Sequence, residues 1–406
     1  MNTKQEKILK IIYLVFILVL TLYTIGILTG VLNDFWLKPA TGSNIPYGTR
    51  PTYTNVYNFP NNEASDSGLL TLLSLINIYL LLDFFLLSKI TGWKKTATTI
   101  ASVIIILFVT EVVYWNAIRK NPSMFTPHPI WLWQVTPNLN NFKYIQETTV
   151  SSNKYGFRNP DFPQKKPQGQ FRVMLLGDSS AHGFMVNEEE TFAYILEKRL
   201  KELNPGKDIL IINAANPGTT TTLGRAFFED TGYKFEPDII LISYNNDHGR
   251  ERETDNSRIP RGIIRPIKKA LYKSAIYLGL RKELVNMQVR RNPALAVMQP
   301  GEKFINRVPV SEYKDNIRYF KEYADKTGAK VILLEMPKSA YISDYYKALS
   351  EAAAENKCMY IDFMKDFEQL PTSEYIFEDG IHPTAKGHKR IADSLVELFN
   401  REKLIK

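Results

Sequence analysis

The chain has 406 residues, of which 44% are hydrophobic and 23% are charged, and it carries a formal net charge of +9. This length accommodates two or three domains, and the composition excludes a chain that is disordered throughout. The single cysteine, Cys358, excludes an internal disulfide and a thiolate metal cluster.

Three long apolar segments occupy the first third of the chain. They are residues 11–32, 68–87 and 97–118. The first contains no charged residue, the second contains only Asp83, and the third contains only Glu111. Each is long enough to cross about 30 Å of hydrocarbon as a helix. We therefore predict a region of three transmembrane helices within residues 1–120, which excludes a purely cytosolic protein.

The lysine and arginine residues around these segments predict their orientation. Lysines precede the first segment and occupy the short loop between the second and third, whereas the longer loop at 33–67 holds only Lys38 and Arg50. Because positive charge accumulates on the cytoplasmic side, the N-terminus is expected there. Three crossings then place the remainder of the chain outside, in a multi-pass protein of the cytoplasmic (inner) membrane.

The two charged residues within the apolar segments have two interpretations. Asp83 and Glu111 either belong to a proton pathway or contact a helix partner or the membrane interface. The helix rise places Asp83 in the inner third of the membrane and Glu111 nearer the outer third, which is poor geometry for a pair. We favour the second interpretation for both.

A segment rich in proline, asparagine and aromatic residues follows, at 121–170. Its residues Trp131 and Trp133 suit the outer membrane interface, where amphipathic rings are favoured. They equally suit the core of the next domain, and the sequence leaves both positions open.

From residue 171 to the end of the chain, short apolar runs alternate with amphipathic helices. Such runs are typical of strands buried on both faces. The alternation predicts a parallel sheet covered by helices on both sides, an α/β fold built as a three-layer α/β/α sandwich. The five predicted strands are residues 173–176, 209–213, 239–244, 331–336 and 359–362.

Two helices of this domain have clear sequence signals. Residues 191–203 place apolar side chains on one stripe, with Thr191 as the N-cap. The final helix presents a second stripe, and Pro383 is expected in its first turn.

The chemistry of such a fold lies at the carboxyl ends of its strands. Ser179 follows the first predicted strand, and His382 and Asp379 precede the last helix. A serine becomes a nucleophile when a histidine accepts its proton, and a carboxylate can orient that histidine. These residues therefore predict a catalytic triad.

The other strand ends offer hydrogen-bond donors for an oxyanion. We expect the backbone N–H groups of Ser179 and Gly218 and the side-chain amide of Asn246 to form an oxyanion hole. Asp178 and Asp247 lie beside these positions and are expected to fix the turns by accepting backbone N–H bonds. Singly, each of these residues also suits a cap or a turn, but their occurrence together at four strand ends favours catalysis.

The pattern Gly177-Asp178-Ser179, Gly218, Asn246-Asp247 and Asp379-x-x-His382 resembles the SGNH (GDSL-type) hydrolase superfamily over about residues 171–402. The resemblance implies a flavodoxin-like sandwich that hydrolyses esters or transfers acyl groups without a metal or cofactor. The segment 153–158 is similar to a lead-in found in membrane-tethered members. The chain departs from the family pattern at two positions, Ser180 and Tyr244, and a bulky Tyr244 is expected to narrow the pocket or shift Asn246.

The remaining histidines have no spacing typical of metal ligands. We expect them at the surface or in packing positions, with His182 on an exposed loop. They are His128, His182, His248 and His388.

A basic insertion, residues 248–310, carries the whole net charge of the chain. It contains 14 lysine or arginine residues and 5 acidic residues. Beside transmembrane helices this favours anionic lipid or another polyanion over nucleic acid. The insertion is either a helical lid with solvated lysines or an interfacial surface on lipid or a phosphate-bearing glycan.

The sequence thus predicts three parts: a membrane region at 1–120, the lead-in at 121–170 and an SGNH-like catalytic domain at 171–406. The predicted function is a membrane-anchored serine esterase that acts on O-acyl esters of cell-envelope glycans or lipids. Two alternatives remain: an O-acyltransferase that uses the same triad, and a non-catalytic scaffold of an envelope assembly, in which the three helices dock a membrane-protein partner.

Overall fold

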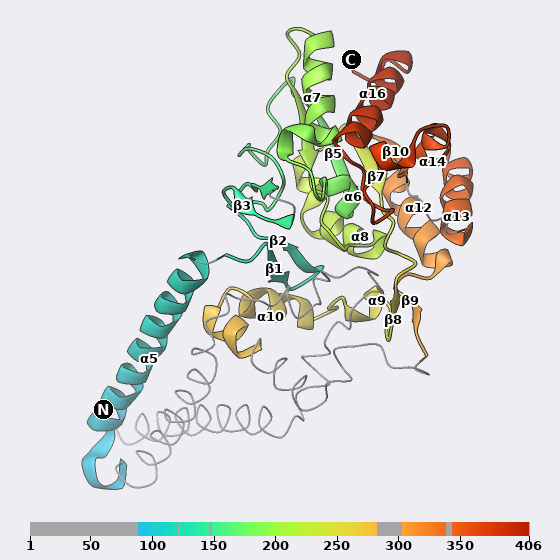
Figure 1. The fold of residues 1–406 in the computed structure, drawn as a ribbon. Helices are drawn as coiled ribbons and strands as arrows, with labels where there is room; N and C mark the ends of the chain where they lie inside the picture. Colours follow the sequence, from blue (N-terminus) through green and yellow to red (C-terminus); the bar gives the residue numbers. More distant parts are fainter. Residues whose placement is uncertain (1–87, 121, 146–147, 282–302, 338–342, 406) are drawn as a thin grey trace. The chain divides into compact units, whose positions relative to one another are not determined.

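The computed structural model describes residues 88–120, 122–145, 148–281, 303–337 and 343–405. The chain divides into two compact units. Of the described residues, the first unit contains 88–120, 122–123 and 266–281, and the second contains the rest. Figure 1 shows the second unit as layers of helix and sheet.

A five-stranded parallel sheet forms the centre of the second unit. Its strand order is β11-β10-β7-β5-β6, and every neighbouring pair is parallel. The strands coincide with the predicted ones to within two residues at either end, so the predicted parallel sheet is confirmed. They are β5 (Phe171–Gly177), β6 (Ile209–Asn213), β7 (Ile239–Ser243), β10 (Lys330–Glu335) and β11 (Met359–Asp362).

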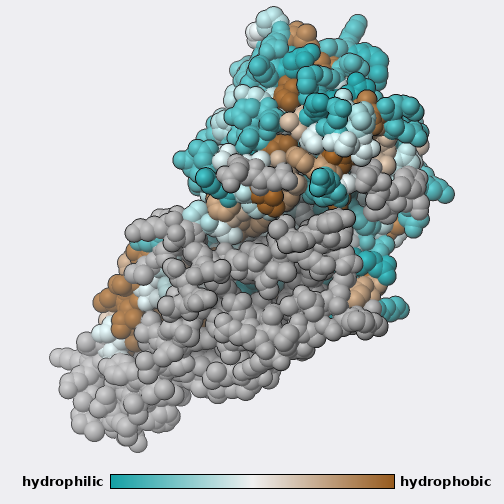
Figure 2. All heavy atoms as spheres, viewed as in Figure 1, coloured by the Kyte–Doolittle hydropathy of each residue, from teal (hydrophilic) through white to brown (hydrophobic). Residues whose placement is uncertain are grey.

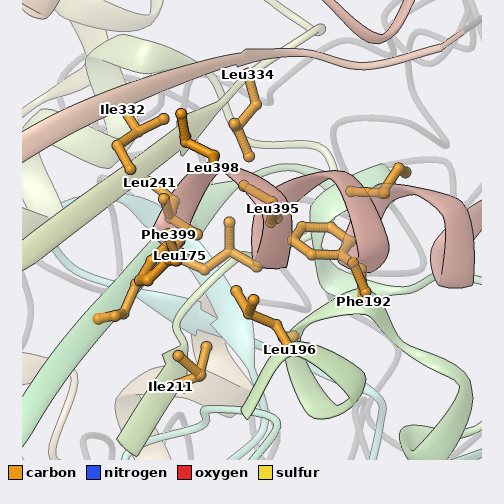
Figure 3. Close-up of a cluster of buried hydrophobic side chains, with 14 of the residues drawn as sticks. Leu175, Phe192, Leu196, Ile211, Leu241, Ile332, Leu334, Leu395, Leu398 and Phe399 are labelled. Atoms are coloured by element: carbon orange, nitrogen blue, oxygen red, sulfur yellow. The ribbon is translucent and has the colours of Figure 1, made fainter. Parts of the chain in front are cut away.

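Helices cover both faces of this sheet because its central strands are apolar on both sides. Val173 and Leu175 of β5 face a core formed with α7 (Phe192–Leu203), α14 (Phe363–Phe367) and α16 (Ala385–Arg401) (Figure 3). The alternate residues of β5, Met174 and Leu176, are also fully buried, since side chains of a strand point to opposite faces in turn. A second group of helices contacts the sheet and one another: α8 (Thr221–Asp230), α12 (Val310–Thr327) and α13 (Ser343–Glu355).

Of the two predicted helix starts, the structure confirms that of α7 and differs at that of α16. Thr191 caps α7 by accepting a hydrogen bond from Tyr194 N, as predicted. Pro383, however, does not lie in the first turn of α16. The N-cap is Thr384, whose hydroxyl accepts a hydrogen bond from Gly387 N, so the proline stands one residue before the cap.

The lead-in segment contributes small sheets to the second unit. The hairpin of β1 (Phe125–His128) and β2 (Leu132–Val135) contains both tryptophans. Trp131 is 6% exposed and Trp133 is 3% exposed. Of the two positions that the sequence left open, these residues therefore occupy the core of the domain.

Short elements complete the described chain. They are β3 (Phe142–Lys143), β4 (Thr149–Val150), α6 (Ser179–His182), η3 (Glu188–Glu190), η4 (Gly232–Phe235), β8 (Arg250–Glu251), α9 (Asp255–Arg258), α10 (Ile264–Leu271), β9 (Ile305–Asn306) and α15 (Thr372–Tyr375).

The first unit contains the third predicted membrane segment as helix α5 (Ser88–Lys120). Within the described ranges, α5 is the one helix that is long and apolar enough to cross a membrane. Its side chains Ile104, Ile105 and Phe108 are each more than half exposed, and Figure 2 shows apolar surface along this helix. The other two predicted membrane segments, residues 11–32 and 68–87, lie outside the described residues.

Glu111 of α5 contacts the basic insertion within the first unit. Its carboxylate accepts hydrogen bonds from the hydroxyl of Ser274 (2.9 Å) and from the backbone N–H groups of Ala275 (2.6 Å) and Ile276 (3.0 Å). These groups begin the helical residues 275–281, whose free N–H groups a carboxylate satisfies well. Glu111 thus has a helix partner, as favoured from the sequence. Asp83 lies outside the described residues, and the roles of the insertion as lid or lipid surface both stay predictions.

Candidate active site

Ser179 stands at the turn that joins the central strand β5 to the single-turn helix α6. Asp178 caps this helix, and its Oδ1 accepts a hydrogen bond from Ser180 N (3.0 Å). Gly183 ends the turn with a φ of 87°, a left-handed conformation that glycine adopts without strain. The turn therefore fixes the backbone on both sides of the serine.

The turn before α16 brings His382 to this serine. His382 Nε2 lies 2.8 Å from Ser179 Oγ. His382 Nδ1 lies 2.6 Å from Asp379 Oδ2, while Asp379 Oδ1 accepts backbone hydrogen bonds from Ile381 (2.9 Å) and His382 (3.0 Å). The three predicted triad residues thus form one chain of hydrogen bonds. Their catalytic role stays a prediction.

The electrostatics of Asp379 suit a carboxylate that orients a histidine. Partial burial by itself would raise its pKa, but the hydrogen bonds and charge of His382 and the Ile381 N–H outweigh burial and lower the pKa to about 2. Asp379 is therefore ionised across the physiological range. The ring of Phe184 lies beside His382, with a centroid separation of 4.7 Å, and limits the space around the imidazole.

The predicted oxyanion donors lie at the ends of neighbouring strands. Among the described residues, the backbone N–H groups of Ser179 and Gly218 donate to no acceptor. Gly218 adopts a φ of +78°, where a side chain would be strained. The side-chain amide of Asn246 donates to Asp178 Oδ2 (3.1 Å), which also accepts the N–H of Asn245 (2.7 Å). Asp178 thus joins the turn of Ser179 to the loop of Asn246.

The side chain of Tyr244 is buried against helix α8, with its hydroxyl directly over the Cα of Gly224. A larger residue at 224 would collide with this ring, so Gly224 makes room for the tyrosine. The expected shift of Asn246 is not needed to accommodate it.

Asp247 is fully buried beneath the site. Its Oδ1 accepts hydrogen bonds from the backbone N–H and the hydroxyl of Thr221, and its Oδ2 has no hydrogen-bond partner among the described residues. Burial raises the pKa of Asp247 from 3.8 to about 7, although the bonds from Thr221 oppose this shift.

This raised pKa predicts a pH dependence of stability. Because Asp247 holds its proton in the folded state up to about pH 7 but releases it near pH 3.8 when unfolded, the stability that it contributes is present at pH 4 and lost as pH rises to 7. Asp247→Asn removes this titration. The melting temperature of Asp247→Asn relative to wild type is therefore expected to increase from pH 4 to pH 7 and to level off above it. The corresponding change in the free energy of unfolding, relative to wild type, should be on the order of 4 kcal/mol, because a difference of one pKa unit corresponds to about 1.4 kcal/mol. A difference that is independent of pH would contradict the assignment.

His182 was expected on an exposed loop, and this expectation is wrong. The histidine is 1% exposed, because the single turn of α6 directs it inward. Burial, together with the nearby charges of Arg158 and His388, holds the pKa of His182 well below its usual value. His182 is therefore neutral. His388 is also buried and stacks on Phe192.

Arg158 contributes to the site in a way that the sequence did not predict. This buried arginine donates hydrogen bonds to the carbonyl oxygens of His182 (3.2 Å), Gly183 (2.5 Å) and Val186 (2.7 Å). It thereby fixes the loop that follows Ser179. The likeness of residues 153–158 to a known lead-in pointed to this segment, but nothing in the sequence pairs Arg158 with carbonyl groups so far along the chain.

The arrangement is suited to acyl chemistry. A serine hydroxyl, an imidazole, an ionised carboxylate and backbone N–H groups without an acceptor among the described residues lie at one edge of the sheet. No group of three His, Cys, Asp or Glu side chains in the described part of the chain is arranged to hold a metal ion.

Comparison with known proteins identifies the family. The model of the GDSL-like lipase/acylhydrolase family matches residues 175–390, more than half of the chain. No curated protein matches the chain.

Solved structures with a similar fold include TesA, with 16% identity and a TM-score of 0.37 over 56% of this chain and 97% of TesA. A lipase/acylhydrolase from Enterococcus faecalis has 16% identity and a TM-score of 0.38, over 57% of this chain and 96% of that one. A two-domain esterase active on acetylated mannans has 17% identity and a TM-score of 0.38; the match covers 58% of this chain and 50% of the esterase.

The family match includes the end of β5, the other four strands of the sheet, the turn of Ser179 and the turn of Asp379. This chain therefore belongs to the GDSL-like lipase/acylhydrolase family of SGNH hydrolases and is a serine ester hydrolase.

Proposed function

We propose that this enzyme hydrolyses O-acyl esters through Ser179, His382 and Asp379 by way of an acyl-enzyme. The observation that carries the proposal is the chain of two short contacts, His382 Nε2 to Ser179 Oγ at 2.8 Å and His382 Nδ1 to Asp379 Oδ2 at 2.6 Å. This arrangement supplies each group that a serine hydrolase needs, in hydrogen-bond reach of the next.

The reaction follows from the placement of these groups. Ser179 Oγ attacks the ester carbonyl carbon while His382 Nε2 takes the hydroxyl proton. Asp379 holds the Nδ1–H tautomer and stabilises the imidazolium that results. When the tetrahedral intermediate collapses, the bond to the alcohol oxygen breaks and His382 returns the proton to that oxygen. A water molecule, deprotonated by His382, then releases the acyl group as a carboxylic acid and restores Ser179.

The proposed oxyanion hole stabilises the negative charge of each tetrahedral intermediate. The N–H groups of Ser179 and Gly218, which donate to no acceptor among the described residues, support this role, and the second hydrogen of the Asn246 amide is the third donor. One such donor typically contributes about 3 kcal/mol to the transition state.

We further propose that the enzyme is anchored in the cytoplasmic membrane with its catalytic unit outside, and that its substrates are acylated glycans or lipids of the cell envelope. Helix α5 supports the anchor, since it is long and apolar and carries exposed apolar side chains. An extracytoplasmic site would meet envelope esters rather than cytosolic ones.

The substrate class is tested by comparing the rate at which the enzyme releases free acid from O-acylated envelope glycans with the rate for an aryl acetate. Acyl groups recovered on an added hydroxyl compound instead of as free acid would favour acyl transfer.

Membrane topology gives a separate prediction. A reporter that is active only outside the cytoplasm should work when fused after Lys406 and fail when fused near Trp93, because the positive charges flanking the membrane segments hold the loop near Trp93 inside. The measurement is reporter activity in intact cells, with both fusions expressed at equal levels. The reverse pattern would place the catalytic unit in the cytosol and exclude envelope substrates.

A further inference from the structure

The peptide bond between Pro217 and Gly218 contains the N–H group that the proposed function assigns to the oxyanion hole. In a planar trans peptide, the C=O and the N–H point in opposite directions, and the described chain contains no cis peptide bond. A group that holds the carbonyl of Pro217 therefore also aims the N–H of Gly218.

Trp133 supplies that group. Its indole Nε1–H donates to Pro217 O at 2.9 Å. The indole ring also lies against Gly218, since a Cβ added there would be 3.3 Å from its Cζ2. Because Trp133 is 3% exposed, this hydrogen bond is shielded from water. A hydrogen bond to the carbonyl also polarises the peptide and makes its N–H a stronger donor.

The backbone of Trp133 is itself bonded to the same loop. The side chain of Asn216 donates to Trp133 O (2.9 Å) and accepts from Val135 N (3.1 Å). The side-chain amide of Asn216 therefore bonds to the backbone of strand β2 through both its N–H and its oxygen. These two bonds hold the hairpin and the loop in a fixed relative position, which fixes the indole relative to Pro217.

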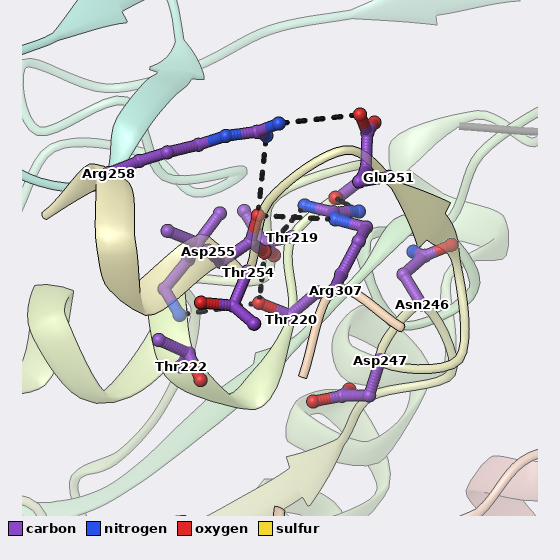
Figure 4. A network of polar contacts seen from close by, with 12 residues as sticks. Thr219, Thr220, Thr222, Asn246, Asp247, Glu251, Thr254, Asp255, Arg258 and Arg307 are labelled. Atoms are coloured by element: carbon purple, nitrogen blue, oxygen red, sulfur yellow. Dashed lines mark hydrogen bonds and ion pairs between the residues drawn. The ribbon is translucent and has the colours of Figure 1, made fainter. Parts of the chain in front are cut away.

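Arg307 holds the next peptide of the loop. Its Nη1 donates to Gly218 O at 2.7 Å, and its Nη2 lies 2.9 Å from Asp255 Oδ2. Asp255 in turn accepts a hydrogen bond from the hydroxyl of Thr220 (2.7 Å), as Figure 4 shows. The guanidinium also lies over the ring of Trp133, 5.7 Å from its centroid. Each of the two peptide groups that flank the Cα of Gly218 therefore has its carbonyl oxygen bonded to a buried side chain.

From these contacts we infer that Trp133 and Arg307 are positioning residues for the oxyanion hole, which they serve by fixing the two peptides of Gly218. This inference rests on the proposed function. Trp133 lies outside the residues that match the family, 175–390, and Arg307 lies in the basic insertion. The lead-in segment and the insertion therefore both act on catalysis, although neither touches the reacting atoms.

The experiment compares the full chain carrying Trp133→Phe with wild type. Phenylalanine keeps an aromatic ring against Gly218 but removes the Nε1–H. The kcat for an aryl acetate is expected to fall about 10-fold, a part of the 10²–10³-fold loss seen when an oxyanion donor is removed outright. KM should stay within about 2-fold, since the interaction matters only when negative charge develops. Inhibition by a boronic acid that adds to the serine as a tetrahedral anion should weaken by the same factor as kcat.

A matched control lies on the same hairpin. Trp131 is also buried, and its ring packs on Phe227 and His128, but no hydrogen bond joins its indole to the described residues of the Gly218 loop. Trp131→Phe makes the same chemical change and should leave kcat and boronate inhibition near wild type. Equal kcat values for Trp133→Phe and Trp131→Phe, both folded by thermal melting, would overturn the inference.

Arg307→Lys provides a second test in case the tryptophan variant is unstable. Lysine cannot bond Gly218 O and Asp255 together with a planar fork, so kcat and boronate affinity should again fall together while KM is retained. Arg258→Lys is the control, because Arg258 pairs with Glu251 and Asp255 in the same buried network, and in the described part of the chain no hydrogen bond or ion pair joins it to the Gly218 loop. A loss of kcat as large in Arg258→Lys as in Arg307→Lys would also overturn the inference.

Different results would refute the proposed function and the positioning role. If Ser179→Ala retained wild-type activity, the proposed function would be wrong. If activity depended on Ser179 but neither Trp133→Phe nor Arg307→Lys changed kcat, only the positioning role would be wrong.

Discussion

Ser179→Ala is expected to lower kcat/KM for an aryl acetate by at least about 10³-fold, because the variant keeps the oxyanion donors but lacks the nucleophile. The melting temperature should stay close to that of wild type, since Ser179 Oγ bonds only His382 Nε2 among the described residues. A fluorophosphonate probe should label the wild-type enzyme and fail to label the variant.

Ser180→Ala is the matched control, one residue further along the same turn. Its hydroxyl donates a long hydrogen bond to Ile381 O at 3.4 Å, and no hydrogen bond joins it to His382 in the described part of the chain. This variant should retain activity within a few-fold and should still react with the probe. Labelling at any residue other than Ser179, or activity that survives Ser179→Ala, would refute the triad.

Gly177→Ala is expected to give the second large effect, on both stability and activity. A Cβ at this position would collide with the backbone carbonyl oxygen of Ser243 on the neighbouring strand β7 and would lie 2.5 Å from Ala181 Cβ. The carbonyl of Gly177 also accepts hydrogen bonds from Asn216 N (2.9 Å) and the hydroxyl of Thr219 (3.1 Å). Forcing β5 and β7 apart here would disturb the turn of Ser179 and the loop of Gly218 together.

We expect Gly177→Ala to destabilise the protein by about 3 kcal/mol, within the range for overpacking a buried site. The remaining folded protein should have a strongly reduced kcat. Urea unfolding and aryl acetate hydrolysis measure the two effects.

The double variant Gly177→Ala/Ala181→Gly separates the two collisions. It removes the contact with the side chain of residue 181 but keeps the one with Ser243 O, which is backbone and cannot move without breaking the sheet. It should therefore recover little stability. Full recovery would show that the strand spacing is not what requires glycine at 177.

Local sequence pattern determined much of this fold. Uniformly apolar runs mark strands that are buried on both faces, and the five predicted strands coincide with β5, β6, β7, β10 and β11 to within two residues. Thr191 was recognisable as a cap because its hydroxyl satisfies an N–H only three residues away. Such features depend on neighbours along the chain, so the sequence contains them.

The grouping of the site residues was also predictable. The carboxyl ends of parallel strands lie at one edge of the sheet. Because β5 pairs with both β6 and β7, Ser179, Gly218 and Asn246 approach one another at that edge. The tight turn from Asp379 to His382 supplied a carboxylate and an imidazole at a spacing that permits their contact. The contacts of His382 with Ser179 and Asp379 are those expected of these residues.

Only the tertiary structure decided what supports these residues. The hydrogen bond from Trp133 to Pro217 joins residues 84 positions apart, and the one from Ala275 to Glu111 joins residues 164 apart. Nothing in the local pattern around either partner specifies the other. The burial of His182 likewise depends on distant residues that pack around its turn, among them Arg158, which donates a hydrogen bond to the carbonyl oxygen of His182. Sequence periodicity determines which face of an element is buried, whereas the partner of a polar group is determined only when distant segments pack together.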